Sequence, residues 1–305
     1  MSVLQRGLDR FARQLLFPDG KASTNFSSPL GEQALTPPDS VSWKIFKNPL
    51  SLFVGGVAAV ILEFAEPRVR AGVWQHSNFR TNPLARLQRT GLAAMMTVYG
   101  PRRAALAMIE HVTQLHERVE GVSPEGFSYR ATDPELLGFV HATAVFGFSE
   151  AYSRYVQPLS KSDRDRLCAE AIPSAHAYGV IDPPTDFANL LESLNRLDDR
   201  LSPSPILDDF FSIITKVPLL PSPLKPLQRM LVRAAIEMVP PLYRERTELG
   251  AERGLRSWEL PIVQWVGGIA DELPLLSLPP AQSCLRLGLD PNYLYRQRDK
   301  VHAAA

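Results

Sequence analysis

The stretch "LARLQRTGLAAMMTVYGPRRAALAMIEHVTQLHERVEG" (residues 84–121) predicts two helices joined by a short turn. Apolar residues recur three and four positions apart on both sides of Gly100-Pro101, as they do along one face of an α-helix. Proline fits the first turn of a helix, because its missing N–H would have no partner there. We therefore expect helices over 83–99 and 101–119, packed side by side.

The same pattern extends along most of the chain and predicts an all-α fold. Proline follows Asn82 and Asp133, which are good helix caps, and Ser160 with Asp163 forms a capping-box pattern. Alternation of apolar and polar residues, the sign of a half-buried strand, is nearly absent. Further helices are expected over 50–64, 67–77, 134–156, 160–172, 185–200, 206–216, 223–239, 258–273 and 290–302.

Residues 1–47 are predicted to form an amphipathic helix and an irregular arm (27–40), and residues 48–305 one helical domain. The apolar side of the first helix either packs on the body of the protein or lies on a membrane surface. The Pro-rich stretch "VPLLPSPLKP" (217–226) is either a linker or a strap across the surface. The residues that make the first helix amphipathic are Leu4, Leu8, Phe11 and Leu15.

The composition is that of an ordinary globular protein. Of the 305 residues 45% are hydrophobic and 21% charged, and the net charge of +1 gives no reason to expect a nucleic acid partner. Cys168 and Cys284 lie far apart, which argues against disulfides and structural zinc and favours a reducing compartment. The apolar run "PLSLFVGGVAAVIL" (49–62) is shorter than the roughly 20 residues of a transmembrane helix and predicts a buried helix. We expect a cytoplasmic protein, with peripheral membrane contact through the first helix as the alternative.

Two histidines on the expected helix 101–119 face different ways. Five positions at about 100° each place His111 on the polar side and His116 among apolar side chains. An inward imidazole is either a core side chain bonded to a carbonyl oxygen or an axial ligand to a haem iron, and the helix alone leaves both open. No H-x-x-x-H or H-E-x-x-H pattern supports zinc or non-haem iron. The apolar residues on the face of His116 are Ala105, Met108, Ile109, Val112 and Val119.

The helix before it carries a face of small and polar side chains. Such a face either allows close helix packing or leaves room for a flat ligand, with Arg86 meeting an anionic group and Thr90 offering a hydroxyl. His141 also points inward from an apolar helix, as a core side chain, a hydrogen-bond partner near a ligand or an alternative iron ligand. The face consists of Arg86, Thr90, Ala93, Ala94 and Thr97.

Other candidates have simpler explanations. The pair Gly55-Gly56 lies in an apolar run, where close helix packing explains it better than phosphate binding. We interpret Glu63 and Glu66 as the charged end of that helix rather than as paired catalytic carboxylates. The motifs G-x-S-x-G, G-x-x-x-x-G-K-[ST] and G-x-G-x-x-G are absent from the sequence.

Several short motifs in a fixed order resemble the MpaB/latex-clearing-protein oxygenase family. The resemblance spans about residues 48–245 and is strongest over 55–152. The motifs are "GG" (55–56), "EPRVRAGVWQHSNF" (66–79), "NPLARLQRT" (82–90), "HERVEG" (116–121), "YRATDPELLGFVHAT" (129–143) and "EAY" (150–152).

This resemblance implies a globin-like helical domain around a pocket for non-covalently bound haem b. The histidine of H-x-x-V-x-G falls on His116 as the proximal iron ligand, and that of V-H-A-T falls on His141. The R-x-x-R-T segment implies Arg86 and Thr90 as pocket residues that orient oxygen and substrate. Arg89 stands where the rubber-cleaving branch can carry a lysine, so a mechanism that depends on that lysine does not carry over.

The expected function is therefore that of a haem-dependent oxygenase. Its partners would be O2 and an apolar, alkene-bearing small molecule. The sequence shows no secretion signal, which departs from the rubber-cleaving branch and argues against an extracellular polymer as substrate. Two other classes stay open at this point, a non-catalytic haem-binding sensor or carrier and a cofactor-free helical binding protein.

Overall fold

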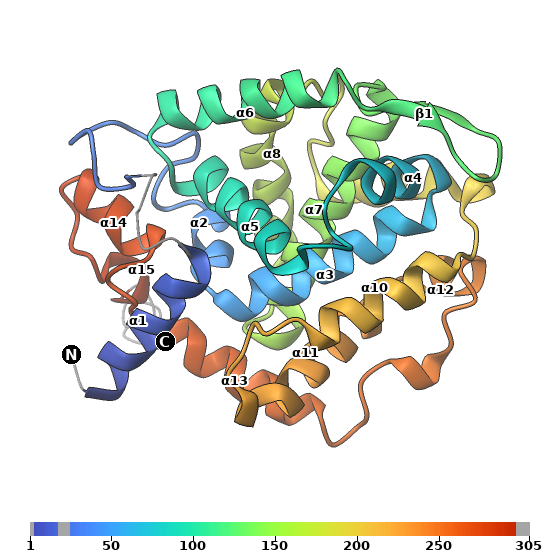
Figure 1. Cartoon of the computed structure of the whole chain (residues 1–305). Helices are drawn as coiled ribbons and strands as arrows, with labels where there is room; N and C mark the ends of the chain where they lie inside the picture. Colours follow the sequence, from blue (N-terminus) through green and yellow to red (C-terminus); the bar gives the residue numbers. More distant parts are fainter. Residues whose placement is uncertain (1–2, 18–24, 297–305) are drawn as a thin grey trace.

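The computed structural model describes residues 3–17 and 25–296 and confirms the all-α fold class. A short antiparallel hairpin accompanies the helices (Figure 1), and the described residues also form three 3-10 turns. The α-helices are α1 (Val3–Leu16), α2 (Val41–Phe46), α3 (Pro49–Ala65), α4 (Pro67–His76), α5 (Pro83–Tyr99), α6 (Arg102–His116), α7 (Pro134–Tyr155), α8 (Lys161–Ala177), α9 (Phe187–Asn195), α10 (Pro205–Lys216), α11 (Lys225–Glu237), α12 (Pro241–Arg246), α13 (Leu260–Glu272), α14 (Pro279–Arg286) and α15 (Tyr293–Arg296). The strands are β1 (Glu120–Val122) and β2 (Ser128–Arg130), and the 3-10 turns are η1 (Asp198–Arg200), η2 (Ser222–Leu224) and η3 (Ala251–Arg253).

Helices α3 and α7 form the centre of the molecule and pack on each other along most of their length (Figure 1). Two glycines permit this close approach. A Cβ atom at Gly55 would lie 2.8 Å from the Gly147 carbonyl oxygen, and one at Gly147 would lie 2.4 Å from the Gly55 carbonyl oxygen. The prediction that Gly55 serves close helix packing is confirmed, whereas Gly56 has only a loose contact with Phe148.

The chain turns sharply between α3 and α4. Asn48 caps α3 by accepting from the Leu50 and Ser51 amides, and Glu66 caps α4 in the same way. Pro67 follows Glu66, and the residue before a proline avoids helical geometry, so the first helix ends there. Among the described residues no helix is long and apolar enough to cross a membrane, and α3 with α4 would qualify only as a pair bent by 113°.

Most predicted helix starts are confirmed by their caps. The side chain of Asn82 accepts from the Ala85 amide, and that of Asp133 accepts from the Glu135 amide. Ser160 and Asp163 form the predicted capping box at α8. Helix α6 begins one residue later than predicted, because Pro101 is the cap position and has no side-chain hydrogen bond there.

Two predicted helix ends were wrong, and one predicted helix is interrupted. The helix expected over 101–119 ends at His116, because the chain then turns into the β1–β2 hairpin, in which Glu120 pairs with Arg130. Helix α8 continues through Pro173 to Ala177, beyond the predicted end at 172, and buries Ala175 against the body. The region 185–200 splits into α9 and η1.

Other differences concern short elements. Helices α2, α12 and α14 were not predicted, because six to eight residues give too little periodicity to detect. Of the helix expected over 290–302, the structure describes α15, and residues 297–305 lie outside the described part.

The N-terminal arm is irregular from residue 25 to 40, as predicted. Helix α1 contacts the segment before α14, where Gln5 Nε2 donates to the Pro274 carbonyl oxygen at 2.9 Å and the Ser277 amide donates to Asp9 at 3.0 Å. The side chains of Leu4, Leu8, Phe11 and Leu15, predicted to form the apolar face, are not among those that the structure describes.

The Pro-rich stretch 217–226 runs between α10 and α11 and is tied to both. The side chain of Gln228 donates to the carbonyl oxygens of Ile214 and Val217 at 2.9 and 2.8 Å. Its own amide oxygen accepts from the Leu220 N–H at 3.3 Å. These hydrogen bonds hold residues 217–226 against the body of the protein, so the stretch is a strap and not a free linker.

Candidate functional site

Arg86 and Thr90 lie on α5, one helical turn apart, as the sequence predicts. Arg86 is partly buried, and its guanidinium donates to the Thr90 hydroxyl. That hydroxyl in turn donates to the Arg86 carbonyl oxygen at 2.9 Å. The hydroxyl of the exposed Thr90 is thus linked to Arg86 by two hydrogen bonds. Burial lowers the pKa of Arg86, Glu63 opposes this effect and Arg89 adds to it.

His116 is the last residue of α6 and is partly buried, whereas His111 on the same helix is exposed. This confirms the predicted directions of the two histidines. Burial lowers the pKa of His116, and the positive charge of Arg86 lowers it further. The imidazole is therefore mainly neutral near pH 7, which is the form that binds a metal ion.

Glu63 on α3 completes this cluster, and sequence analysis did not identify it as a site residue. Burial raises the pKa of its carboxyl group to about 7, although Arg86 and a hydrogen bond from Thr143 act in the opposite direction. The Thr143 hydroxyl lies 3.4 Å from Glu63 Oε1. Arg86 thus interacts electrostatically with groups on two other helices, Glu63 and His116.

His141 lies on α7, two residues before Thr143. Its Nε2 atom is buried and has no hydrogen-bond partner among the residues that the structure describes. Burial lowers the pKa of the ring to about 4, so the ring is neutral under physiological conditions. A buried polar atom without a partner costs free energy, which is why such atoms are rare outside functional sites. The inward direction predicted for His141 is confirmed.

These residues come from two helix pairs, Glu63 and His141 from α3 and α7, and Arg86 and His116 from α5 and α6. Helix α3 packs closely on α7, and α5 packs on α6, but neither member of the first pair packs closely on either member of the second. Each helix also has residues three, four or seven positions apart on one face that stay partly exposed, and on α5 residues on other faces are partly exposed as well. These faces include Gly56, Val60 and Glu63 on α3, Arg86, Ala93 and Thr97 on α5, Met108, Val112 and His116 on α6, and Leu137, His141 and Val145 on α7.

The small face of α5 therefore does not serve close packing along its whole length. Ala93 and Thr97 stay partly exposed, and the Thr97 hydroxyl lies 3.2 Å from that of Tyr178, just beyond α8. Among the described residues no three His, Cys, Asp or Glu side chains come together as ligands for a metal ion.

Ionisable side chains with shifted pKa values, gathered inside a helical fold, are typical of an enzyme active site. Residues 43–267 match the family described as ER-bound oxygenase mpaB/B'/rubber oxygenase, catalytic domain. The match covers well over half of the chain, so the protein belongs to this family of oxygenase catalytic domains. The resemblance inferred from the short motifs is confirmed. No curated protein and no solved structure matches the chain.

Proposed function

We propose that this protein is a haem b-dependent oxygenase that uses O2 to oxidise an apolar, alkene-bearing small molecule. Membership of an oxygenase family supports the general reaction class. The observation that supports a bound cofactor is the buried Nε2 atom of His141, a neutral imidazole nitrogen that has no hydrogen-bond partner among the residues that the structure describes.

The donor set fits a haem. His116 and His141 are both neutral imidazoles, the ligand form for iron, and we propose that His116 would bind the iron, with His141 as the alternative. Arg86 offers a cation for a propionate group on a cofactor held without covalent bonds. Bound haem would supply the redox chemistry that activates O2, which these side chains cannot supply alone.

The chain's own residues would position the reactants and handle protons. Glu63 has a pKa near 7, so its carboxyl group can hold or release a proton at Oε1 at physiological pH. Arg86 favours the charged form of Glu63 and is itself held in place by Thr90. The apolar side chains on the surrounding faces would bind the substrate and exclude water.

A hemin titration of the purified protein tests this proposal. We expect a Soret band, one haem per chain, and loss of that haem on acid-solvent extraction, because no C-x-x-C-H attachment motif occurs. His116→Gln should lose most of the haem, whereas His111→Gln, an exposed position on the same helix, should bind as the wild type does. His141→Ala should largely keep it.

Other outcomes point to the other classes. A folded protein that takes up no hemin would contradict the proposal and favour a cofactor-free binding protein. Haem binding without oxygen consumption in the presence of a panel of alkenes would favour a sensor or carrier. Haem loss in His141→Ala but not in His116→Gln would assign the iron-binding role to His141 on α7.

A further inference from the structure

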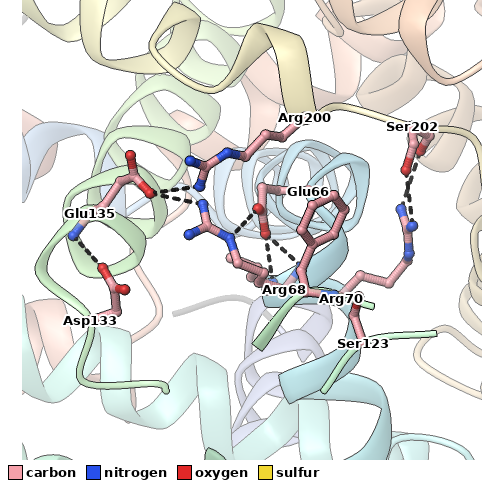
Figure 2. A network of polar contacts seen from close by, with 10 residues as sticks. Glu66, Arg68, Arg70, Ser123, Asp133, Glu135, Arg200 and Ser202 are labelled. Carbon is pink, nitrogen blue, oxygen red and sulfur yellow. Dashed lines mark hydrogen bonds and ion pairs between the residues drawn. The ribbon is translucent and has the colours of Figure 1, made fainter. Parts of the chain in front are cut away.

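Helix α4 carries two buried arginines that hold the chain segment between His116 and His141. Arg68 donates to the buried carboxylate of Glu66 at 2.6 Å and to Glu135, in the first turn of α7, at 2.9 Å (Figure 2). Glu135 also accepts from Arg200 at 3.1 Å. Arg68 thus fixes the start of the helix that carries His141.

Arg70 binds the same segment at a position closer to His116. Its side chain is 1% exposed and donates to the Phe64 carbonyl oxygen at 2.6 Å. It also donates to both the carbonyl oxygen and the hydroxyl of Ser202, each at 3.2 Å (Figure 2). Its charged partner is Glu125, which lies in the turn between β1 and β2. The hairpin is therefore tied to the corner between α3 and α4 by a charge-assisted hydrogen bond.

The hairpin has little freedom relative to His116. Three residues separate His116 from β1, and the Val119 amide donates to the His116 carbonyl oxygen at 3.0 Å. The Ala131 amide, after β2, donates back to Val119 at 2.9 Å. Gly72 of α4 lies against both Val119 and the ring of Tyr129. The hairpin therefore packs directly on α4.

We propose that Arg70 is a positioning residue, which fixes the β1–β2 hairpin through Glu125 and so sets the direction in which His116 presents its ring. The ring direction matters for catalysis only if the proposed function holds, but the positioning itself does not depend on haem. A rigid support of this kind is what a ligand residue at the end of a helix requires, because its own helix does not continue beyond it.

The ion pair between Arg70 and Glu125 depends on the charge of both side chains. Burial raises the pKa of the Glu125 carboxyl, but hydrogen bonds from Arg70 and Ser123 outweigh it and hold the pKa below its ordinary value. Removing the charge of Glu125 would leave a buried guanidinium without a counter-charge, which is far more costly than losing an exposed ion pair. The same hairpin offers a matched control, because Glu120 and Arg130 form an ion pair with side chains 61% and 75% exposed.

The test compares Glu125→Gln with Glu120→Gln in the haem-free protein. Spectra of protein labelled with 15N-histidine report on the His116 ring, which is assigned by the signal lost in His116→Gln. Hydrogen exchange reports on the amides of residues 117–130. We expect Glu125→Gln to shift or broaden the His116 signals and to speed exchange of the hairpin roughly tenfold or more. Glu120→Gln should leave both unchanged.

A folded Glu125→Gln protein with unchanged His116 signals would overturn the inference, and so would equal effects in the two variants. Ser202→Ala, which removes one acceptor of Arg70 away from the hairpin, should leave the His116 signals in place. A hemin titration adds a second reading, in which Glu125→Gln binds several-fold more weakly than Glu120→Gln. Failure of the wild type to bind hemin would contradict the proposed function, while the His116 signals would still decide the positioning role.

Discussion

At the scale of single residues, the site depends on how burial changes the chemistry of Glu63. The residue lies in the last turn of a largely apolar helix, and the sequence alone predicts a solvated charge there. Burial instead raises the pKa of its carboxyl group to about 7. Arg86 lies close enough to limit this rise, so the two side chains are electrostatically coupled.

Glu63→Gln should change the pH dependence of stability. The pKa of Glu63 rises from 4.5 to about 7 on folding, so the unfolded chain ionises first as the pH rises through this window. The wild type therefore loses stability between these two values and the loss stays constant above pH 7. Because Glu63 keeps some exposure, which reduces the effect, we expect the wild type to lose about 1–2 kcal/mol of its free energy of unfolding over this pH range. Glu63→Gln should not show this loss.

Chemical denaturation of both proteins across this pH range measures the difference. Glu110→Gln, at an exposed position on α6, is the control for an unspecific change in charge. A Glu63→Gln protein whose stability follows the same pH curve as the wild type would show that the carboxyl group is not held in its neutral form.

Thr90 should act through Arg86. We expect Arg86→Leu to lower turnover sharply, and Thr90→Val to lower it less, because Thr90 is exposed and bonds to the guanidinium. Steady-state oxygen consumption and haem content, measured together, separate two roles of the arginine. Haem loss in Arg86→Leu would indicate that Arg86 holds a propionate, and intact haem with low turnover would indicate a role in orienting oxygen or substrate. Wild-type turnover in both variants would mean that these residues only pack.

At the scale of elements, the contact between α3 and α7 fixes the frame on which the site is built. Glu63 comes from one helix and His141 from the other, so their spacing depends on how closely the two backbones approach. Gly147 permits that approach, because a Cβ atom there would lie 2.4 Å from one backbone atom of α3 and 3.2 Å from another.

Gly147→Ala should destabilise the protein by about 3 kcal/mol, since neither backbone can move away without disturbing the core. Gly138→Ala in the same helix is the matched control. No atom lies within 4 Å of a Cβ placed at Gly138, so this change should stabilise the helix by about 0.5–1 kcal/mol. Thermal and urea unfolding of the two variants tests the pair, and equal effects would contradict the tight contact.

At the scale of the whole molecule, Arg286 joins parts of the chain that lie far apart in sequence. Its side chain is 1% exposed and donates to the carbonyl oxygens of Phe26, Glu32 and Tyr99 at 2.7, 2.7 and 2.8 Å. The N-terminal arm, the end of α5 and α14 therefore meet at one guanidinium. Arginine suits this position because its planar group carries five N–H donors in fixed directions.

Arg286→Met should destabilise the protein by about 2–4 kcal/mol, because several buried carbonyl groups lose their donor at once. Arg296→Met is the control, since Arg296 is 65% exposed and pairs with the exposed Asp290. This change should alter stability by less than about 1 kcal/mol. Limited proteolysis of residues 25–40 gives an independent reading. An arm that stays protected in Arg286→Met would show that other contacts hold it.

The local sequence determined most of the helices and their starts. The caps at Asn82, Asp133 and Ser160 form hydrogen bonds between neighbouring residues, so the pattern of side chains suffices to predict them. The face of an amphipathic helix is equally local, which is why the inward direction of His116 and the outward direction of His111 were predictable. The ordered motifs were enough to identify the family.

Only the tertiary structure decided the features that depend on contacts between residues far apart in sequence. The pKa of Glu63 depends on α5 and α7, and the end of α6 depends on a hairpin whose strands pair across a turn. The role of Arg70 depends on Glu125, 55 residues away in sequence. Such contacts join residues that no short window of sequence holds together, and their energies come from burial, which exists only once the helices have packed.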